Sequence, residues 1–126
     1  MGIWGIILLV VCVMSATMIG FGLLFSVAAP KKINFVFGYR TPMSMKNLDT
    51  WNFGNIYSGK IMWRTGAILL VGSLAALFAV MSNSQTVIRN VGIVIIIVHA
   101  VMIIGSVIFT EIALRKNFDH SGNRKG

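Results

Sequence analysis

This chain of 126 residues is poor in the side chains on which most enzyme chemistry depends. It has only three acidic residues, Asp49, Glu111 and Asp119, and they are too widely separated to predict the paired carboxylates of general acid and base catalysis. No nucleophile motif combining serine or cysteine with histidine is recognisable, and there is no glycine-rich phosphate loop. We therefore expect no catalytic residue and no enzyme activity.

Cysteine and histidine are equally scarce. The single cysteine, Cys12, lies in an apolar run, which excludes a disulfide within the chain. His99 lies in the middle of another apolar run and His120 in the polar C-terminal segment, so no cluster of metal ligands is predicted. A neutral His99 hydrogen-bonded to a neighbouring helix is favoured over a metal ligand, a haem ligand or a proton relay. We expect no cofactor and no metal.

What the chain does contain is long apolar runs. Hydrophobic residues make up 56% of the sequence, and runs at about 3–29, 64–82 and 91–112 are long enough to cross a bilayer. The prediction is an all-α integral membrane protein that forms one domain over residues 1–126. A cleaved signal peptide is the rival interpretation of the first run, because Ser26-Val27-Ala28 resembles a cleavage site. No Lys or Arg precedes that run, however, and it exceeds the roughly 7 to 15 residues of a signal core.

Small residues within the spans predict close helix packing. Ala16 and Gly20 lie four residues apart in the first span, and Gly72 and Ala76 have the same spacing in the second. Such pairs let two backbones approach closely. For Ala16 and Gly20 we expect packing within the chain rather than a specific dimer.

A polar and aromatic segment, residues 31–63, separates the first two spans. Pro30 ends the first span, and the alternation from Ile33 to Tyr39 predicts an extended stretch at the membrane interface. Thr41-Pro42 is a helix start signal, with Ser44 as a second possible cap.

After this start signal, apolar positions at helical spacing predict an amphipathic interfacial helix between the first and second spans. Trp51 is expected in the aromatic belt at head-group level, and Gly54 and Gly59 are expected to mark a bend before the second span. The tail, residues 115–126, is predicted to be disordered.

The net charge of +8 is distributed unevenly. With three spans, only Arg89 falls on the side of the N-terminus. The other side carries Lys31, Lys32, Arg40, Lys46, Lys60, Arg64, Arg115, Lys116, Arg124 and Lys125. Positive residues stay cytoplasmic, which predicts a cell-membrane protein with its N-terminus outside and its C-terminus in the cytoplasm. Anionic lipid head groups, rather than nucleic acid, are the expected partner of this charge.

The polar segment also resembles a known family. The string Asn34-x-x-x-Gly38-Tyr39-Arg40-Thr41-Pro42 is followed by Ser44-Met45-Lys46-Asn47, Trp51-x-x-Gly54-Asn55 and Ser58-Gly59-Lys60, and together they are similar to the signature of the SdpI family. The pair of spans that follows also fits that family. Its founding member is a longer protein, with additional membrane spans before the motif.

The resemblance implies a membrane protein that gives immunity to a secreted sporulation-delaying toxin. It also implies signalling, in which toxin engagement leads the protein to hold a cytoplasmic repressor at the membrane. A peptide toxin and a repressor protein are therefore the expected partners. The alternative is a small transport or ion-handling subunit that works as a homo-oligomer, with His99 and Glu111 lining a wet cavity.

Candidate binding residues follow from the motif and from its charge. They are Asn34, Gly38, Tyr39, Arg40, Thr41, Trp51, Asn55 and Glu111. Glu111 is the only acidic residue within a predicted span, and we hypothesise that it pairs with Arg40 or Arg64; the alternative is that it reaches water beside Arg115. For Asn34 and Asn55 the expected role is structural, since their amides can satisfy backbone groups where the extended segment meets the helix.

Overall fold

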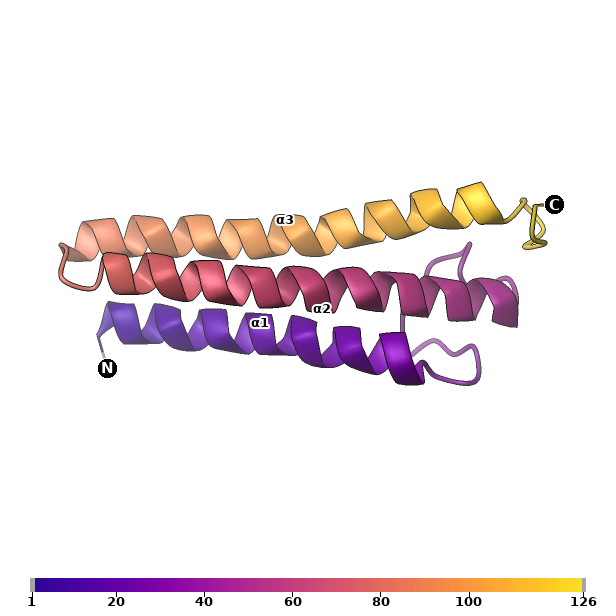
Figure 1. Cartoon of the computed structure of the whole chain (residues 1–126), viewed down its shortest axis with the longest axis horizontal. Helices are drawn as coiled ribbons and strands as arrows, with labels where there is room; N and C mark the ends of the chain where they lie inside the picture. Colours follow the sequence, from indigo (N-terminus) through magenta and orange to yellow (C-terminus); the bar gives the residue numbers. More distant parts are fainter. Residues whose placement is uncertain (1, 126) are drawn as a thin grey trace.

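Three long helices lie side by side in the computed structural model, which describes residues 2–125 (Figure 1). They are α1 (Ile3–Ala28), α2 (Leu48–Ala79) and α3 (Gln85–Asn117). The chain runs up, down and up, so the N-terminus and the turn between α2 and α3 lie at one end, and the segment between α1 and α2 and the C-terminal residues lie at the other. The predicted all-α architecture is confirmed: no strand is found among residues 2–125, only an isolated bridge between Phe118 and Arg124.

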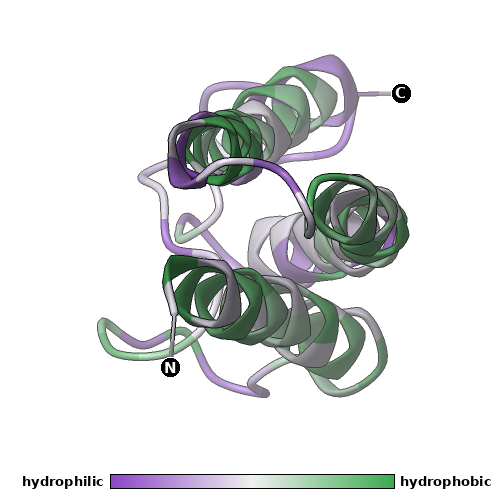
Figure 2. Ribbon diagram, turned by 90° about the vertical axis from the view of Figure 1, so that its left-hand side faces the viewer, coloured by the Kyte–Doolittle hydropathy of each residue, from purple (hydrophilic) through white to green (hydrophobic). Residues whose placement is uncertain are grey.

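All three helices are long and apolar enough to cross a membrane. The hydrophobic colouring of Figure 2 runs along the helices, while hydrophilic residues gather in the connections. This confirms a multi-pass membrane protein. At 1.5 Å per residue, the 32 and 33 residues of α2 and α3 give lengths of about 48 and 50 Å, against a hydrocarbon core of about 30 Å. Both helices must therefore extend beyond the core.

Glycines bring the backbones of α1 and α2 into contact. A Cβ atom on Gly22 would lie 2.7 Å from the Gly59 carbonyl oxygen, and one on Gly59 would lie 2.6 Å from the Gly22 carbonyl oxygen. The predicted packing of Ala16 and Gly20 is wrong, because both are exposed and a Cβ on Gly20 would meet nothing within 4 Å. The packing face of α1 is offset from them and passes through Gly22.

The segment predicted as a separate interfacial helix is instead the first part of α2. The helix runs without interruption through Gly54 and Gly59, which contradicts the bend predicted there. It starts later than predicted: Asn47 is the N-cap, its Oδ1 accepts from the Thr50 backbone N–H at 2.9 Å, and the Thr50 hydroxyl accepts from the Asn47 N–H at 3.1 Å. This reciprocal pair satisfies two amides that have no partner within the helix.

The end of the bundle near the N-terminus is closed mainly by aliphatic packing. Its buried residues come from all three helices: Ile7, Val11, Leu77, Ile88 and Ile95. Trp4 on α1 donates its indole N–H to the Leu77 carbonyl at 2.7 Å, which ties the two helices together.

His99 is fully buried on α3 at mid-length of the bundle. Its Nδ1 lies 2.8 Å from the Ile95 carbonyl oxygen and its Nε2 lies 2.8 Å from the Ser15 hydroxyl on α1. Since a carbonyl oxygen can only accept, Nδ1 carries the proton, and in the neutral ring Nε2 accepts from the serine. The predicted hydrogen bond to a neighbouring helix is confirmed.

Candidate functional site

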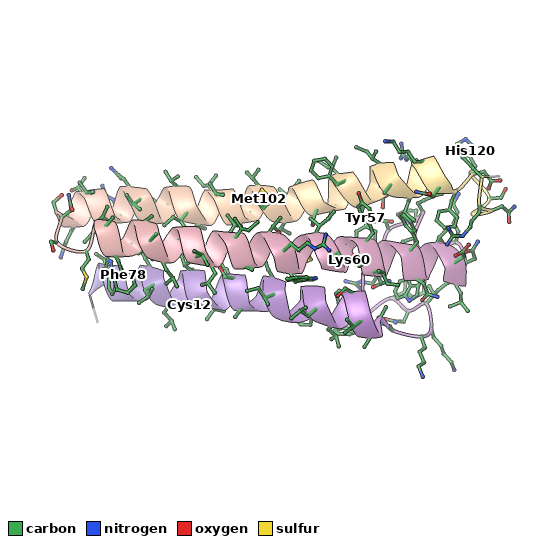
Figure 3. All side chains as sticks on the ribbon, viewed as in Figure 1. Cys12, Tyr57, Lys60, Phe78, Met102 and His120 are labelled. Carbon is green, nitrogen blue, oxygen red and sulfur yellow. The ribbon has the colours of Figure 1, made fainter. Side chains whose placement is uncertain are left out.

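The polar residues gather at one end of the bundle in a structure that we name the cap. It consists of the loop 29–47, the first turns of α2 (residues 48–60), the last turns of α3 (residues 107–117) and the tail 118–125. Figure 3 shows His120 at this end, with Tyr57 and Lys60 nearer to it along α2 than Phe78.

The loop docks on one face of α2 formed by Trp51, Gly54 and Asn55. Gly38 has φ of 112°, and a Cβ there would lie 2.8 Å from Asn55 Oδ1, so glycine is required both by the backbone and by the space. Asn55 is fully buried; its Oδ1 accepts from the Tyr39 backbone N–H at 2.8 Å and its Nδ2 donates to the Trp51 carbonyl at 2.9 Å. Both polar atoms of the Asn55 side chain thus satisfy backbone groups where the loop meets the helix.

Trp51 joins this face of α2 to the end of α1. Its side chain is fully buried, and its indole N–H donates to the Pro30 carbonyl at 2.7 Å. The prediction that Trp51 lies in the interfacial aromatic belt is therefore wrong. A carbonyl left unpaired at the end of α1 needs a partner, and the indole supplies one.

Tyr39 crosses from the loop to α3. Its ring packs against Gly54, where a Cβ would come within 3.0 Å of Cδ1, and its hydroxyl donates to Glu111 Oε1 at 2.6 Å. Burial, followed by this hydrogen bond to the carboxylate, raises the pKa of Tyr39 above its ordinary value.

Glu111 does not pair with an arginine, so our ion-pair hypothesis is wrong. Among residues 2–125 the one salt bridge within 4 Å joins Arg124 and Asp49. Arg64 instead lies 5.7 Å from the centre of the Trp63 ring, and Arg40 donates to the Phe35 carbonyl. The phenol reaches the carboxylate because the loop carries Tyr39 over the bundle.

Thr41 and Ser44 close a turn of their own before the helix. The Ser44 hydroxyl accepts from the Thr41 backbone N–H at 2.9 Å, and the Thr41 hydroxyl accepts from the Ser44 N–H at 3.2 Å. Thr41 and Ser44 therefore exchange the bonds of a cap as expected, but the turn ends before Leu48 and does not continue into α2.

The tip of the loop turns back instead of extending. Asn34 Oδ1 accepts from the backbone N–H groups of Val36 and Phe37, at 3.0 and 2.7 Å, which bends the chain where the alternation predicted an extended stretch. Phe37 packs edge to face on Phe25 of α1. Asn34 thus satisfies backbone groups within the loop tip and not where the loop meets the helix, and Phe35 is 84% exposed at the tip.

The tail folds back onto the start of α2, which contradicts its predicted disorder. Phe118 is 1% exposed and packs on Phe53, with centroids 5.5 Å apart. Arg124 makes two bonds of 2.8 Å to the Asp49 carboxylate, and Asn47 Nδ2 donates to the Gly122 carbonyl at 2.7 Å.

A turn within the tail supports these contacts. The backbone N–H groups of Asn123 and Ser121 donate to Asp119 Oδ1, and together with Gly122 they lower the pKa of that carboxyl. The sequence offered one signal for this fold, a single aromatic residue, Phe118, within a polar stretch.

Six of the eight predicted residues are brought together: Gly38, Tyr39, Thr41, Trp51, Asn55 and Glu111 form one connected network. Asn34 and Arg40 lie apart from them at the loop tip. Within residues 2–125, no buried side-chain nitrogen or oxygen lacks a hydrogen-bond partner, and no group of three metal-ligating side chains is found there. These contacts hold the loop against α2 and join it to α3 through Tyr39.

These features define a small multi-pass membrane protein whose polar residues build a folded cap over a helical bundle. The sequence pattern of the SdpI/YfhL protein family matches residues 31–110, which is more than half of the chain. The chain therefore belongs to the SdpI/YfhL family. The match begins at the loop and ends one residue before Glu111, so it includes nearly all of the docking network.

Comparison with known proteins gives one named relative. The uncharacterized protein YfhL of Bacillus subtilis (strain 168) is 42% identical over 57 residues, which cover 41% of this chain and 52% of that protein. The chain thus matches about half the length of this relative. No solved structure matches the chain.

Proposed function

We propose that this protein is a membrane-embedded immunity and signalling protein of the SdpI type. It protects the cell against a secreted peptide toxin and engages a cytoplasmic regulator through the segment from Asn34 to Lys60. The observation that carries the proposal is that the family pattern coincides with a folded cap. In that cap the motif residues Gly38, Tyr39, Trp51 and Asn55 contact one another, which leaves the exposed loop tip for partners.

The proposal includes an orientation in the cell membrane, with the N-terminus outside and the cap in the cytoplasm. The cap carries nine of the eleven basic residues, Arg64 lies midway along α2, and Arg89 lies near the other end, in the second turn of α3. Reporter fusions after Asn83, in the turn between α2 and α3, should be active only when the reporter requires an external location. A reporter active in the cytoplasm at this position would reverse the orientation.

Protection is tested in cells that are sensitive to the sporulation-delaying toxin. Expression of the wild-type protein should raise the toxin concentration that halves growth. Asn55→Ala, which removes the acceptor for the Tyr39 amide, should abolish most of that protection at equal membrane abundance. Asn52→Ala is the matched control, because Asn52 lies on the same turn of α2 and is exposed. Sensitivity unchanged by the wild-type protein would refute the immunity proposal.

The cap and the bundle also suggest how lipids and a second copy take part. Lys31 and Lys32 are exposed directly after α1, at a depth where ammonium groups meet anionic head groups. Ala16 and Gly20 leave α1 open on its outer face, and we include self-association through this face in the proposal. Crosslinking in membranes, with Gly20→Ile as the blocking variant, tests it.

No observation favours the transport alternative. His99 is fully buried, and both of its ring nitrogens are hydrogen-bonded, one to Ser15 and one to the Ile95 carbonyl. A proton pathway would need such groups to face water.

A further inference from the structure

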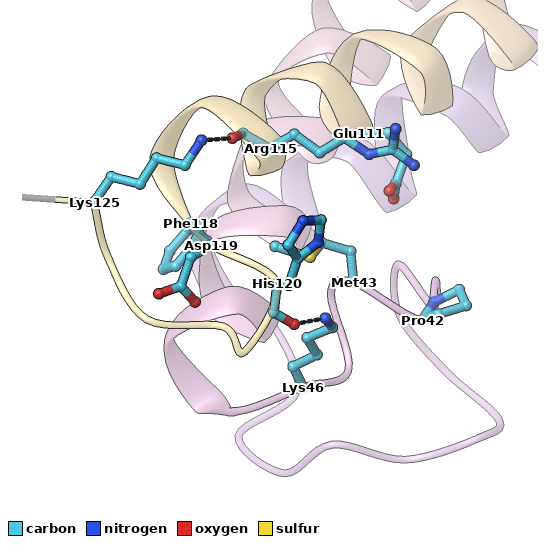
Figure 4. Close-up of a pocket in the computed structure, with 9 residues that line it drawn as sticks. All are labelled: Pro42, Met43, Lys46, Glu111, Arg115, Phe118, Asp119, His120 and Lys125. Atoms are coloured by element: carbon cyan, nitrogen blue, oxygen red, sulfur yellow. Dashed lines mark hydrogen bonds between the residues drawn. The ribbon is translucent and has the colours of Figure 1, made fainter.

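A cavity of about 550 Å³ opens within the cap, between the loop, the end of α3 and the tail (Figure 4). Its walls come from two parts of the chain that are far apart in the sequence: residues 42–46 of the loop, and residues 111–125, which run from the end of α3 into the tail. The lining residues are Pro42, Met43, Lys46, Glu111, Arg115, Phe118, Asp119, His120 and Lys125. In Figure 4, Glu111 and Arg115 lie on the side of α3, opposite Lys46 and the backbone of His120.

The lining offers more cationic donors than the protein uses. Lys46 donates to the His120 carbonyl, and Lys125 donates to the Arg115 carbonyl at 2.8 Å. Each ammonium has three donors, so both retain N–H groups for a ligand. The Arg115 guanidinium has no protein acceptor among residues 2–125, and it is the planar donor best suited to an oxyanion.

The two carboxylates of the lining are already engaged. Glu111 accepts from the Tyr39 hydroxyl at 2.6 Å. Asp119 accepts from the backbone amides of Ser121 and Asn123, at 2.9 and 3.0 Å. The three cations therefore outnumber two acids that each have a partner, and the unsatisfied donors favour an anion.

The depth of the cavity indicates the source of that anion. On α3, Ile108 and Ile112 are 55% and 47% exposed, and they lie about two turns and one turn before Arg115 on the same side of the helix. Along α3 the exposed apolar surface therefore gives way to basic residues beside the cavity, as it does where lipid phosphates lie.

We propose that this cavity binds the phosphate of an anionic lipid. Arg115 holds the phosphate oxygens, Lys46 and Lys125 contribute ammonium groups, and the acyl chains lie along Ile108 and Ile112. Binding at this site depends on three particular side chains, whereas general attraction between a basic protein and a negatively charged membrane surface does not. Because it does not depend on toxin recognition, it holds whether or not the protein confers immunity.

The test compares two adjacent basic residues of α3. Native mass spectrometry of the detergent-solubilised protein measures retention of phosphatidylglycerol and of phosphatidylcholine. Arg115→Gln should weaken phosphatidylglycerol binding about tenfold, whereas Lys116→Gln, which changes the same charge outside the cavity lining, should leave it within about twofold. Lys46→Gln on the opposite wall should weaken it as well, and provides a second variant in case Arg115→Gln does not fold.

Three results would overturn the proposal. Equal losses for Arg115→Gln and Lys116→Gln would mean general charge attraction. Equal retention of phosphatidylcholine and phosphatidylglycerol would mean that the anion is not selected. Binding of inorganic phosphate to the protein in lipid-free micelles, as tight as the binding of the lipid, would mean that the ligand is a soluble anion. If millimolar inorganic phosphate displaces none of the bound lipid, the result supports a lipid site.

Discussion

Replacement of Gly59 by alanine is the sharpest test of how the cap is joined to the membrane bundle. The new Cβ would lie 2.6 Å from the Gly22 carbonyl oxygen and 2.7 Å from the Ser26 amide nitrogen, both of them backbone atoms of α1. Ordinary contact begins at 3.4 Å, so the two helices must separate by about 0.8 Å at this point. Backbone atoms cannot move aside as a flexible side chain can, and overpacking of this kind costs about 1 to 3 kcal/mol.

Gly72→Ala is the control, because a Cβ at Gly72 would meet nothing within 4 Å. Alanine favours a helix over glycine by up to about 1 kcal/mol at either site, and the difference between the two variants removes this shared gain. Unfolding in SDS, followed by circular dichroism, should show Gly59→Ala less stable than Gly72→Ala by about 1 to 3 kcal/mol. Equal stabilities would mean that α1 and α2 are not in backbone contact, and the position of the cap would have to be reconsidered.

Three further outcomes follow from the contacts in the cap. In a double-mutant cycle, Tyr39→Phe and Glu111→Gln should show a coupling of about 1 to 2 kcal/mol, and additive effects would exclude the bond between them. In a Tyr57→Phe background, absorbance at 295 nm should show Tyr39 still protonated at pH 10.0, its ordinary pKa. Since the folded protein favours the neutral phenol, its stabilising effect should be complete below pH 10 and decrease as the pH rises further; half ionisation at pH 10 would contradict this. Asp49→Asn should accelerate amide hydrogen exchange in the tail roughly two- to fivefold at low salt, because Arg124 loses its acceptor, and an effect that persists unchanged in 1 M NaCl would rule out the ion pair as its cause.

The membrane architecture could be predicted because it depends on length and composition. An uncharged run such as 3–29 has few alternatives to a span. The registers between helices could not be predicted in the same way. Gly54 and Gly59 were interpreted as a bend, yet both serve tertiary contacts, with Tyr39 and Gly22. A glycine that permits a bend and one that permits close approach are identical in the sequence.

The hydrogen-bond and ion-pair partners of polar residues are even harder to predict from the sequence. Glu111 and Arg40 carry opposite charges, but the partner of Glu111 is set by how the loop folds, and that brings Tyr39 to it. The tail was predicted to be disordered from its polar composition. Phe118 and Arg124 nevertheless find partners on α2, because the third span returns the chain to the level of Asp49 and Phe53. These tertiary contacts depend on the three-dimensional path of the chain and not on the local conformational preferences of the residues.

The indole bond from Trp51 to Pro30 has a consequence for how the protein is made. Most hydrogen bonds of the loop are with residues that precede position 60, so this part can assemble while the third helix is still being synthesised. The bond from Tyr39 to Glu111 must wait for that helix, and the return of residues 118–125 must follow it. We therefore expect a hairpin of α1 and α2 to form first and the end of the chain to pack onto it afterwards.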